Sequence, residues 1–409
     1  MLIVEDYLPI VGKEVIGSLH AKARKLYGKR VMHVNATYYG GGVAEMLQTF
    51  VPLMNNIGID ADWRIVPGPV DFFNITKQFH NGLHGQDFDL TEEMKKLYVM
   101  NNGDFATYAK LDDDIIIIHD PQPLPLIRFY AKRQPWIWRC HVDLTNPHSD
   151  LWEFLAPFIL RYDRVVVSHE DYVQKDLPNE HVIQHPAIDP LALKNRDMEE
   201  DEIALHLFKL GVPADKPYIL QVSRFDKWKD MPGVIETFKR LRDDFDCRVV
   251  LCGSMASDDP EGIQIYQQVV EDTIEMRESG DVILVTDASN AEVNALQRGA
   301  AVVTQKSSRE GFGLTVTEAM WKAKPVVSTT VGGIPLQIEH EKTGLLSAPD
   351  DFEGFVRNVR RIMEDPGFGA ELGRAAKEKV RTDFLITRML SHDLDMLNDL
   401  LMEGVPPRV

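Results

Sequence analysis

Two glutamates eight residues apart flank a glycine-rich turn in the second half of the chain. Glu310 comes shortly after an apolar run at 301–304 that we predict to be a strand, and Glu318 lies in the helical run that follows. Gly311 and Gly313 let the backbone approach a ligand closely, and the N–H groups at the start of the following helix can hold a phosphate. Glu318 lies about two helical turns beyond Glu310 and could reach a ribose diol from the same side. The other interpretation is that Glu310 caps a helix start and Glu318 is a solvated helix residue.

A second polar segment follows the predicted strand at 218–222. It contains Arg224 and Lys229, whose positive charges could stabilise the charge that develops on a departing diphosphate. The chain carries a net charge of −18, so an anionic ligand needs a local cluster of cations of this kind. Taken alone, the segment could also be a surface loop of mixed charge. Taken together, the two segments follow strands of one predicted domain and supply groups suited to a nucleoside diphosphate.

The elements that must position these residues form an alternating pattern. From Lys29 onward, short β-branched runs alternate with longer runs of helical period, which is typical of a parallel sheet covered by helices. We predict an α/β protein with two doubly wound, Rossmann-like domains whose ligand-binding crevices face a central cleft. The predicted strands are 30–35, 62–66, 114–119, 135–141, 164–168 and 181–184 in the first domain, and 218–222, 248–252, 282–286, 301–304 and 325–328 in the second.

The length of 409 residues also predicts two domains, because single cores stop growing at about 250–300 residues. A polar stretch at 194–202 is the predicted linker. We place the first domain at 1–195 and the second at 205–384, and we expect a final helix at 385–409 to complete the first domain.

Composition and charge exclude several classes of partner. The net charge of −18 argues against a nucleic-acid surface, which needs basic patches. The strongest apolar run, at 115–118, is far shorter than the ~20 residues of a membrane span, so no membrane association is expected. Cys140, Cys247 and Cys252 have no metal-type spacing and are too few for a disulfide framework, which favours a reducing cytoplasm. No protein-held metal site is expected, and the sequence leaves a homodimer open.

The motifs together resemble a known family. An Arg with a Lys five residues later, followed by Glu-x7-Glu around Gly-Phe-Gly-Leu, looks like the donor site of retaining GT-B glycosyltransferases of the sucrose-synthase and trehalose-synthase family. The resemblance covers essentially the whole chain. The segments 119–123, 136–143 and 185–189 are similar in particular to trehalose glycosyltransferring synthases and their phosphorolytic relatives.

The resemblance implies a role for each matching residue. Arg224 and Lys229 would contact the diphosphate, Glu318 the ribose, and Glu310 the donor sugar. The backbone N–H groups offered to sugar and phosphate would be those of Gly311, Phe312, Gly313 and Leu314.

The resemblance also implies roles in the first domain. His141 would lie near the donor glucose, and Asp120 follows a strand where an acceptor hydroxyl could be held. The glycine loop that lies against the donor phosphates and the acceptor would be formed by Gly40, Gly41 and Gly42. From the residues alone, a lone histidine after a strand is more often structural, and the glycines could form a simple strand-to-helix turn.

The resemblance implies glucosyl transfer from ADP-glucose or UDP-glucose to free glucose, with retention and in a reversible reaction. No tightly bound cofactor is expected, and any Mg²⁺ would enter with the nucleotide. A trehalose phosphorylase, a nucleotide-sugar 2-epimerase and a non-catalytic sugar-binding protein are the alternatives. Product analysis with and without nucleotide separates the first of these from the synthase.

Overall fold

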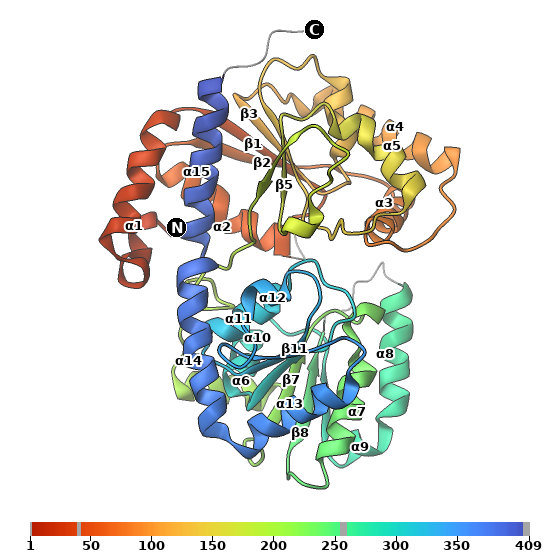
Figure 1. The fold of residues 1–409 in the computed structure, drawn as a ribbon, viewed down its shortest axis with the longest axis vertical. Coiled ribbons are helices and arrows are strands. Elements are labelled where there is room, and N and C mark those ends of the chain that lie inside the picture. Colours follow the sequence, from red (N-terminus) through yellow and green to blue (C-terminus); the bar gives the residue numbers. More distant parts are fainter. Residues whose placement is uncertain (1, 39–41, 254–259, 404–409) are drawn as a thin grey trace. The chain divides into compact units, whose positions relative to one another are not determined.

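The computed structural model describes residues 2–38, 42–253 and 260–403, and the chain forms two compact units. The first unit contains residues 1–187 together with 386–409, and the second contains residues 188–385. The chain thus passes from the first unit to the second between residues 187 and 188. The predicted linker at 194–202 belongs to the second unit. The chain returns to the first unit with its last helix (Figure 1).

The first unit is built on a parallel sheet of six strands in the order β2-β1-β3-β4-β5-β6. The four inner strands are buried almost throughout, as expected for a parallel sheet covered on both faces, whereas the edge strands β2 and β6 are partly exposed. They are β1 (Arg30–Asn35), β2 (Asp60–Ile65), β3 (Ile115–His119), β4 (Trp136–Arg139), β5 (Arg164–Val167) and β6 (Glu180–Ile183).

Helices cover both faces of this sheet. One face carries Val34, Ile118 and Trp138, which share a hydrophobic core with apolar residues of α3 (Val70–Leu83), α4 (Glu92–Ala109) and α5 (Ser149–Ile159). The opposite face carries His33 and Arg139, which contact Phe50 of α2 and Asp393 of α15. The remaining helices are α1 (Leu8–Ala23), α2 (Gly42–Asn56), α15 (Ile386–Glu403) and the short 3-10 turns η1 (Val4–Tyr7), η2 (Arg24–Leu26), η3 (Leu124–Phe129) and η4 (Glu170–Tyr172).

The second unit repeats the plan with a parallel sheet in the order β12-β11-β10-β7-β8-β9. Its strands are β7 (Tyr218–Val222), β8 (Arg248–Cys252), β9 (Val282–Val285), β10 (Val302–Gln305), β11 (Val326–Thr329) and β12 (Leu345–Ser347). Its helices are α6 (Glu200–Lys209), α7 (Met231–Leu241), α8 (Pro260–Asp272), α9 (Ile274–Glu278), α10 (Asn290–Gly299), α11 (Leu314–Trp321), α12 (Ile334–Gln337), α13 (Phe352–Glu364), α14 (Pro366–Asp383) and the 3-10 turn η5 (Lys227–Lys229).

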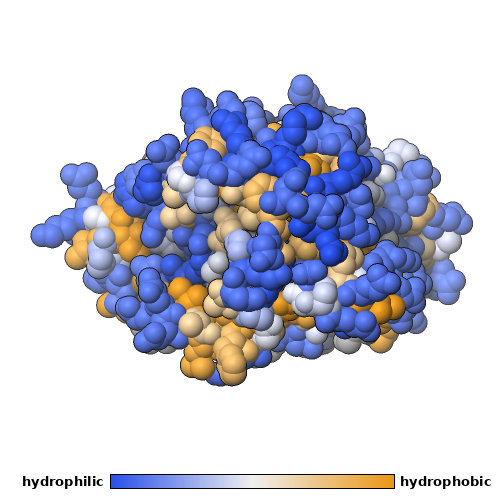
Figure 2. Space-filling view, turned by 90° about the horizontal axis from the view of Figure 1, so that it is seen from below, coloured by the Kyte–Doolittle hydropathy of each residue, from blue (hydrophilic) through white to orange (hydrophobic). Residues whose placement is uncertain are grey.

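Every predicted strand has a counterpart in the structure, with small shifts at the ends. The sequence pattern did not predict the three-residue strand β12 or the N-terminal helix α1. Among the residues that the structure describes, no helix combines the length and apolarity that crossing a membrane requires. The face of the molecule in Figure 2 is mostly hydrophilic, with apolar residues in small groups.

Candidate active site

The loop after β7 is folded so that Lys229 has a fixed position. The Asp226 carboxylate accepts a hydrogen bond from the Trp228 N–H at 2.9 Å and caps the short turn η5. The Lys229 carbonyl accepts a hydrogen bond from the Gln221 side chain at 2.7 Å. Asp230 then adopts a left-handed backbone with φ of 43° and caps α7. These contacts of Asp226, Gln221 and Asp230 therefore fix the position of the Lys229 backbone.

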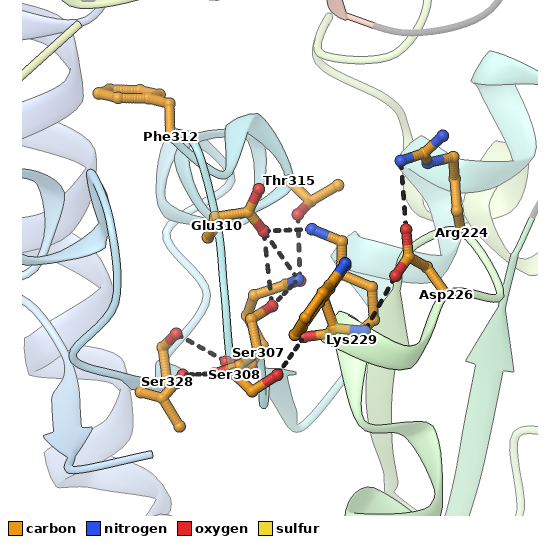
Figure 3. A network of polar contacts seen from close by, with 12 residues as sticks. Arg224, Asp226, Lys229, Ser307, Ser308, Glu310, Phe312, Thr315 and Ser328 are labelled. Carbon is orange, nitrogen blue, oxygen red and sulfur yellow. Dashed lines mark hydrogen bonds and ion pairs between the residues drawn. The ribbon is translucent and has the colours of Figure 1, made fainter. Parts of the chain in front are cut away.

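Lys229 reaches across to Glu310, which lies in the loop after β10. The two charged groups are 2.6 Å apart, and their side chains are 14% and 12% exposed. The same Glu310 oxygen, Oε2, also lies 3.4 Å from the Gln305 amide and 3.5 Å from the Ser307 hydroxyl (Figure 3). The two motifs found in the sequence thus form one polar cluster.

The two loops are also joined through their backbones. The Ser308 N–H donates to the Trp228 carbonyl at 2.8 Å. The Arg309 guanidinium lies over the Trp228 ring, 4.7 Å from its centroid. These contacts hold the loop after β7 and the loop after β10 side by side. A ligand that binds one loop therefore also lies next to the other.

Arg224 is the exposed cation of this cluster. Its side chain is 48% exposed, and its guanidinium lies 3.4 Å from the Asp226 carboxylate. Figure 3 shows Arg224 on the far side of Lys229 from Glu310, with its guanidinium above the Asp226 carboxylate. Its charge therefore remains accessible to an anionic ligand.

The glycine-rich turn leads from this cluster into α11. Gly313 is the residue before the helix and has a φ of +85°, and a Cβ there would lie 3.2 Å from Glu310 Cγ. Leu314 begins the helix, so the first-turn N–H groups, which lack intrahelical partners, are presented at this turn. The Phe312 side chain is buried and packs against Phe384, and its carbonyl accepts from Gln337 at 2.5 Å. The predicted role of the backbone at 311–314 stays a prediction.

Both alternative interpretations of the glutamate pair are wrong. The residue that precedes α11 is Gly313, so Glu310 does not cap that helix. Glu318 is only 3% exposed and so is not a solvated helix residue. Its Oε1 lies 3.4 Å from Lys194, and its Oε2 is buried without a hydrogen-bond partner among the described residues. A buried carboxylate oxygen without a donor is costly, so this atom is suited to a ligand hydroxyl.

Two lysines beside Glu318 were not predicted. Lys322 donates to the Glu318 carbonyl at 3.1 Å and to Asn195 at 3.0 Å. Burial lowers the pKa of Lys322 to about 7, and the nearby Glu318 opposes that shift. Lys322 is the residue that ends α11, and its four-residue spacing from Glu318 could have indicated it. Lys194 had no local signal, because it comes from the predicted linker.

The first unit brings together two other predicted residues, Asp120 and His141. The Asp120 carboxylate accepts a hydrogen bond from the backbone N–H of His141 at 2.8 Å, and the Asp120 carbonyl accepts one from the Trp138 indole at 3.0 Å. Asp120 has a positive φ of 64°, which is uncommon for a residue other than glycine and is often found at functional sites. The predicted Gly40 and Gly41 lie outside the described residues, and Gly42 begins α2.

The electrostatics of this pair have a clear physical cause. Burial raises the pKa of Asp120 to about 7, and the hydrogen bond from His141 opposes that shift. Burial lowers the pKa of His141 to about 3, and the positive charge of Arg139 contributes. His141 is therefore neutral near neutral pH.

Across the described ranges of the chain, no group of three or more His, Cys, Asp and Glu side chains could hold a metal ion.

Asp120→Asn is expected to raise the melting temperature relative to wild type more at pH 8 than at pH 5. Because the folded-state pKa is raised from 3.8 to about 7, the stability that this group contributes is fully present below the unfolded pKa and is lost as the pH rises through 7. Asparagine keeps the acceptor for His141 and does not ionise. Thermal unfolding of both proteins at several pH values tests this, and a difference in melting temperature that is independent of pH would contradict it.

The chain matches two family models that together span most of its length. Residues 33–174 match the model "Trehalose synthase, N-terminal domain", and residues 202–379 match "Glycosyl transferases group 1". The trehalose synthase of Thermococcus litoralis is 46% identical over 402 residues, covering 97% of this chain and 96% of that protein.

More distant matches include a phosphorylase that is related by sequence and a solved synthase that is related by fold. The trehalose phosphorylase of Grifola frondosa is 31% identical, covering 88% of this chain and 56% of that protein. A solved UDP-forming α,α-trehalose-phosphate synthase from Burkholderia xenovorans, in complex with glucose-6-phosphate, superimposes with a TM-score of 0.74 at 13% identity, covering 91% of this chain and 100% of that one. The GT-B fold class predicted from the sequence is confirmed by this likeness and by the two six-stranded parallel sheets.

Proposed function

This chain belongs to the trehalose synthase family of glycosyltransferases, and on that premise we propose that it makes trehalose from a nucleoside-diphosphate glucose and free glucose. The donor would be ADP-glucose or UDP-glucose, and the reaction would be reversible and proceed with retention. The observation that carries the proposal is the cluster of Arg224, Lys229 and Glu310 beside the start of α11. Two cations and a helix N-terminus there suit a diphosphate in a chain of net charge −18.

The proposed reaction follows a same-face route. The bond between glucose C1 and the diphosphate oxygen breaks, the anomeric hydroxyl oxygen of the acceptor bonds to C1 on the same face, and the hydroxyl proton passes to the departing phosphate oxygen. Arg224 and Lys229 stabilise the negative charge that grows on the diphosphate. Glu310 fixes the Lys229 ammonium through their 2.6 Å contact and faces the sugar. Any Mg²⁺ would arrive with the nucleotide.

Asp120 and His141 would serve the sugars in this proposal. His141, neutral because burial lowers its pKa to about 3, would hydrogen-bond a hydroxyl of the donor glucose. Asp120 would accept a hydrogen bond from the acceptor. We also place the enzyme in the cytoplasm, a proposal supported by its three cysteines, which are all free and buried.

Incubation with glucose and a panel of nucleotide-glucoses tests the proposed function. The expected product is α,α-1,1-linked trehalose plus the free nucleoside diphosphate, identified by NMR and mass spectrometry. A parallel reaction with trehalose and inorganic phosphate but no nucleotide identifies a phosphorylase through glucose 1-phosphate. Conversion of the nucleotide-sugar without any acceptor would identify an epimerase, and either of these results would contradict the proposal.

Glu318→Gln is expected to weaken donor binding by roughly 10- to 100-fold, because a hydrogen bond to a charged group contributes about 1.5–3 kcal/mol. The physical reason is the unpartnered, buried Oε2, which would accept a ribose hydroxyl. Calorimetric titration with a nucleoside diphosphate measures the loss.

Donor analogues that lack one ribose hydroxyl are the matched control for this prediction. If Glu318 contacts the ribose, the loss caused by the variant and the loss caused by the missing hydroxyl should not add. Additive losses would show that Glu318→Gln acts elsewhere, through its buried lysine neighbours.

A further inference from the structure

Three histidines form a continuous row across the first sheet. His33 lies in β1, His119 ends β3, and His141 follows β4. His33 Nδ1 lies 3.0 Å from His119 Nε2, and His119 Nδ1 lies 3.1 Å from His141 Nε2. The rings of His119 and His141 are nearly parallel, with an angle of 4° between their planes. His33 and His119 are fully buried, whereas His141 at the end of the row is partly exposed.

The strand register explains why the row forms. His33 pairs with Ile117 in the parallel ladder, and His119 pairs with Arg139. His119 lies two residues beyond Ile117, and His141 lies two residues beyond Arg139. Because side chains alternate along a strand, all three histidines project from the same face, each one step further along the sheet. This is the face that also contacts α2 and α15.

The two hydrogen bonds of the row must run in the same direction. Burial lowers the pKa of His33 to about 3 and holds the pKa of His119 well below its usual range, so both rings are neutral, as His141 is. A neutral imidazole has one N–H donor and one acceptor nitrogen. If His119 is protonated on Nδ1, then all three rings are Nδ1–H tautomers. If His119 is protonated on Nε2, then all three are Nε2–H tautomers.

The buried end of the row decides between these arrangements. His33 Nε2 is buried and has no hydrogen-bond partner among the described residues. The neighbouring ring of Phe50, 6.0 Å away between centroids, offers no lone pair. The Nε2–H arrangement would bury an N–H without an acceptor, whereas the Nδ1–H arrangement leaves only an unpaired acceptor, which proteins tolerate better.

We infer that His33 and His119 are positioning residues that hold His141 as its Nδ1–H tautomer, so that the free ring nitrogen of His141 is a fixed donor for a sugar hydroxyl. The recipient of this N–H rests on the proposed function, whereas the tautomer itself does not. His141 then acts as a neutral donor that is already oriented before the substrate binds, which avoids reorganisation during the reaction.

Nitrogen NMR of protein labelled with ¹⁵N-histidine tests the tautomer directly in the ligand-free wild type. The His141 resonances, assigned by their loss in His141→Asn, should show a protonated Nδ1 and a bare Nε2. A protonated Nε2 on His141 overturns the inference, whatever reaction the protein catalyses. Because this measurement needs neither substrate nor turnover, it separates the inference from the proposed function.

Two His33 variants test the positioning role. In His33→Leu the row loses its first donor, so His141 should become a mixture of tautomers, and turnover should fall about 3- to 10-fold, the size of one neutral hydrogen bond. In His33→Asn the side-chain amide can donate from nearly the same position as Nδ1, which should restore the His141 tautomer and bring turnover to within about twofold of wild type. If both variants lose turnover equally while the His141 tautomer is unchanged, His33 is only structural.

Discussion

Arg224→Ala is expected to lower turnover at saturating donor by about 10²-fold while leaving the melting temperature close to wild type, because about 2.7 kcal/mol of transition-state stabilisation is lost. Arg224 is 48% exposed, and its contact with Asp226 is 3.4 Å long. Exposed ion pairs of this kind contribute little to stability. The negative charge that it meets is greatest when the diphosphate departs, so its loss affects turnover more than donor affinity.

Lys227→Ala is the matched control for this prediction. Lys227 is an exposed cation in the same loop, and it lies over the Trp228 ring at 4.8 Å from the ring centroid. It has no part in the proposed chemistry, so its removal should leave turnover within about twofold of wild type. Equal losses in the two variants would show that Arg224 contributes only to the general positive field of the loop.

Lys229→Met is expected to lose at least as much turnover, with a loss of stability as well. In this variant the Glu310 carboxylate, whose side chain is only 12% exposed, loses the ammonium group that lies 2.6 Å from it. A buried charge without its partner lowers stability. Pairing this variant with Glu310→Gln separates the two effects. The double variant should recover stability but not turnover, because the charge that faces the diphosphate is still missing. Recovery of turnover would mean that Lys229 serves only to neutralise Glu310.

The parts of the fold that could be predicted from the sequence depend on short-range patterns. The strand at β7 was predicted at its observed bounds because five buried residues, Tyr218–Val222, interrupt a polar sequence. The three residues of β12 are too few for such a pattern. Parallel strands present their carboxyl ends at one edge of a sheet. Arg224, Lys229 and Glu310 follow strands of one predicted domain, so the sequence could also place them at one edge.

The contacts that complete each site depend on long-range packing, which a single sequence does not encode locally. Lys229 and Glu310 are 81 residues apart, and nothing in either motif indicates their ion pair. His33 and His119 are 86 residues apart and meet only because β1 pairs with β3 in a particular register. From the sequence, His141 was the one histidine to which a role was assigned. The structure shows it as the last member of a row, which changes what its ring can donate.

The same limit applies to Arg139, which lies two residues before His141 on the predicted strand 135–141. From the sequence alone, an arginine at this position of the strand could serve the phosphate of a phosphorylated acceptor. In the structure Arg139 is only 3% exposed. Its guanidinium donates to the Gln184 side chain at 2.6 Å and forms an ion pair with Asp393, 254 residues away in α15. Its charge is therefore already compensated inside the first unit.

In a competition between glucose and glucose 6-phosphate at equal concentration, trehalose is therefore expected to exceed trehalose 6-phosphate by at least about tenfold, since each charge-assisted hydrogen bond that the phosphate fails to make costs about 1.5–3 kcal/mol. A phosphate dianion needs local cations in a chain of net charge −18. Arg139→Met, measured beside wild type with both acceptors, completes the experiment. If glucose 6-phosphate were the preferred acceptor and this variant lost that preference while still using glucose, Arg139 would be a phosphate ligand and the buried ion pair with Asp393 would have to open when the acceptor binds.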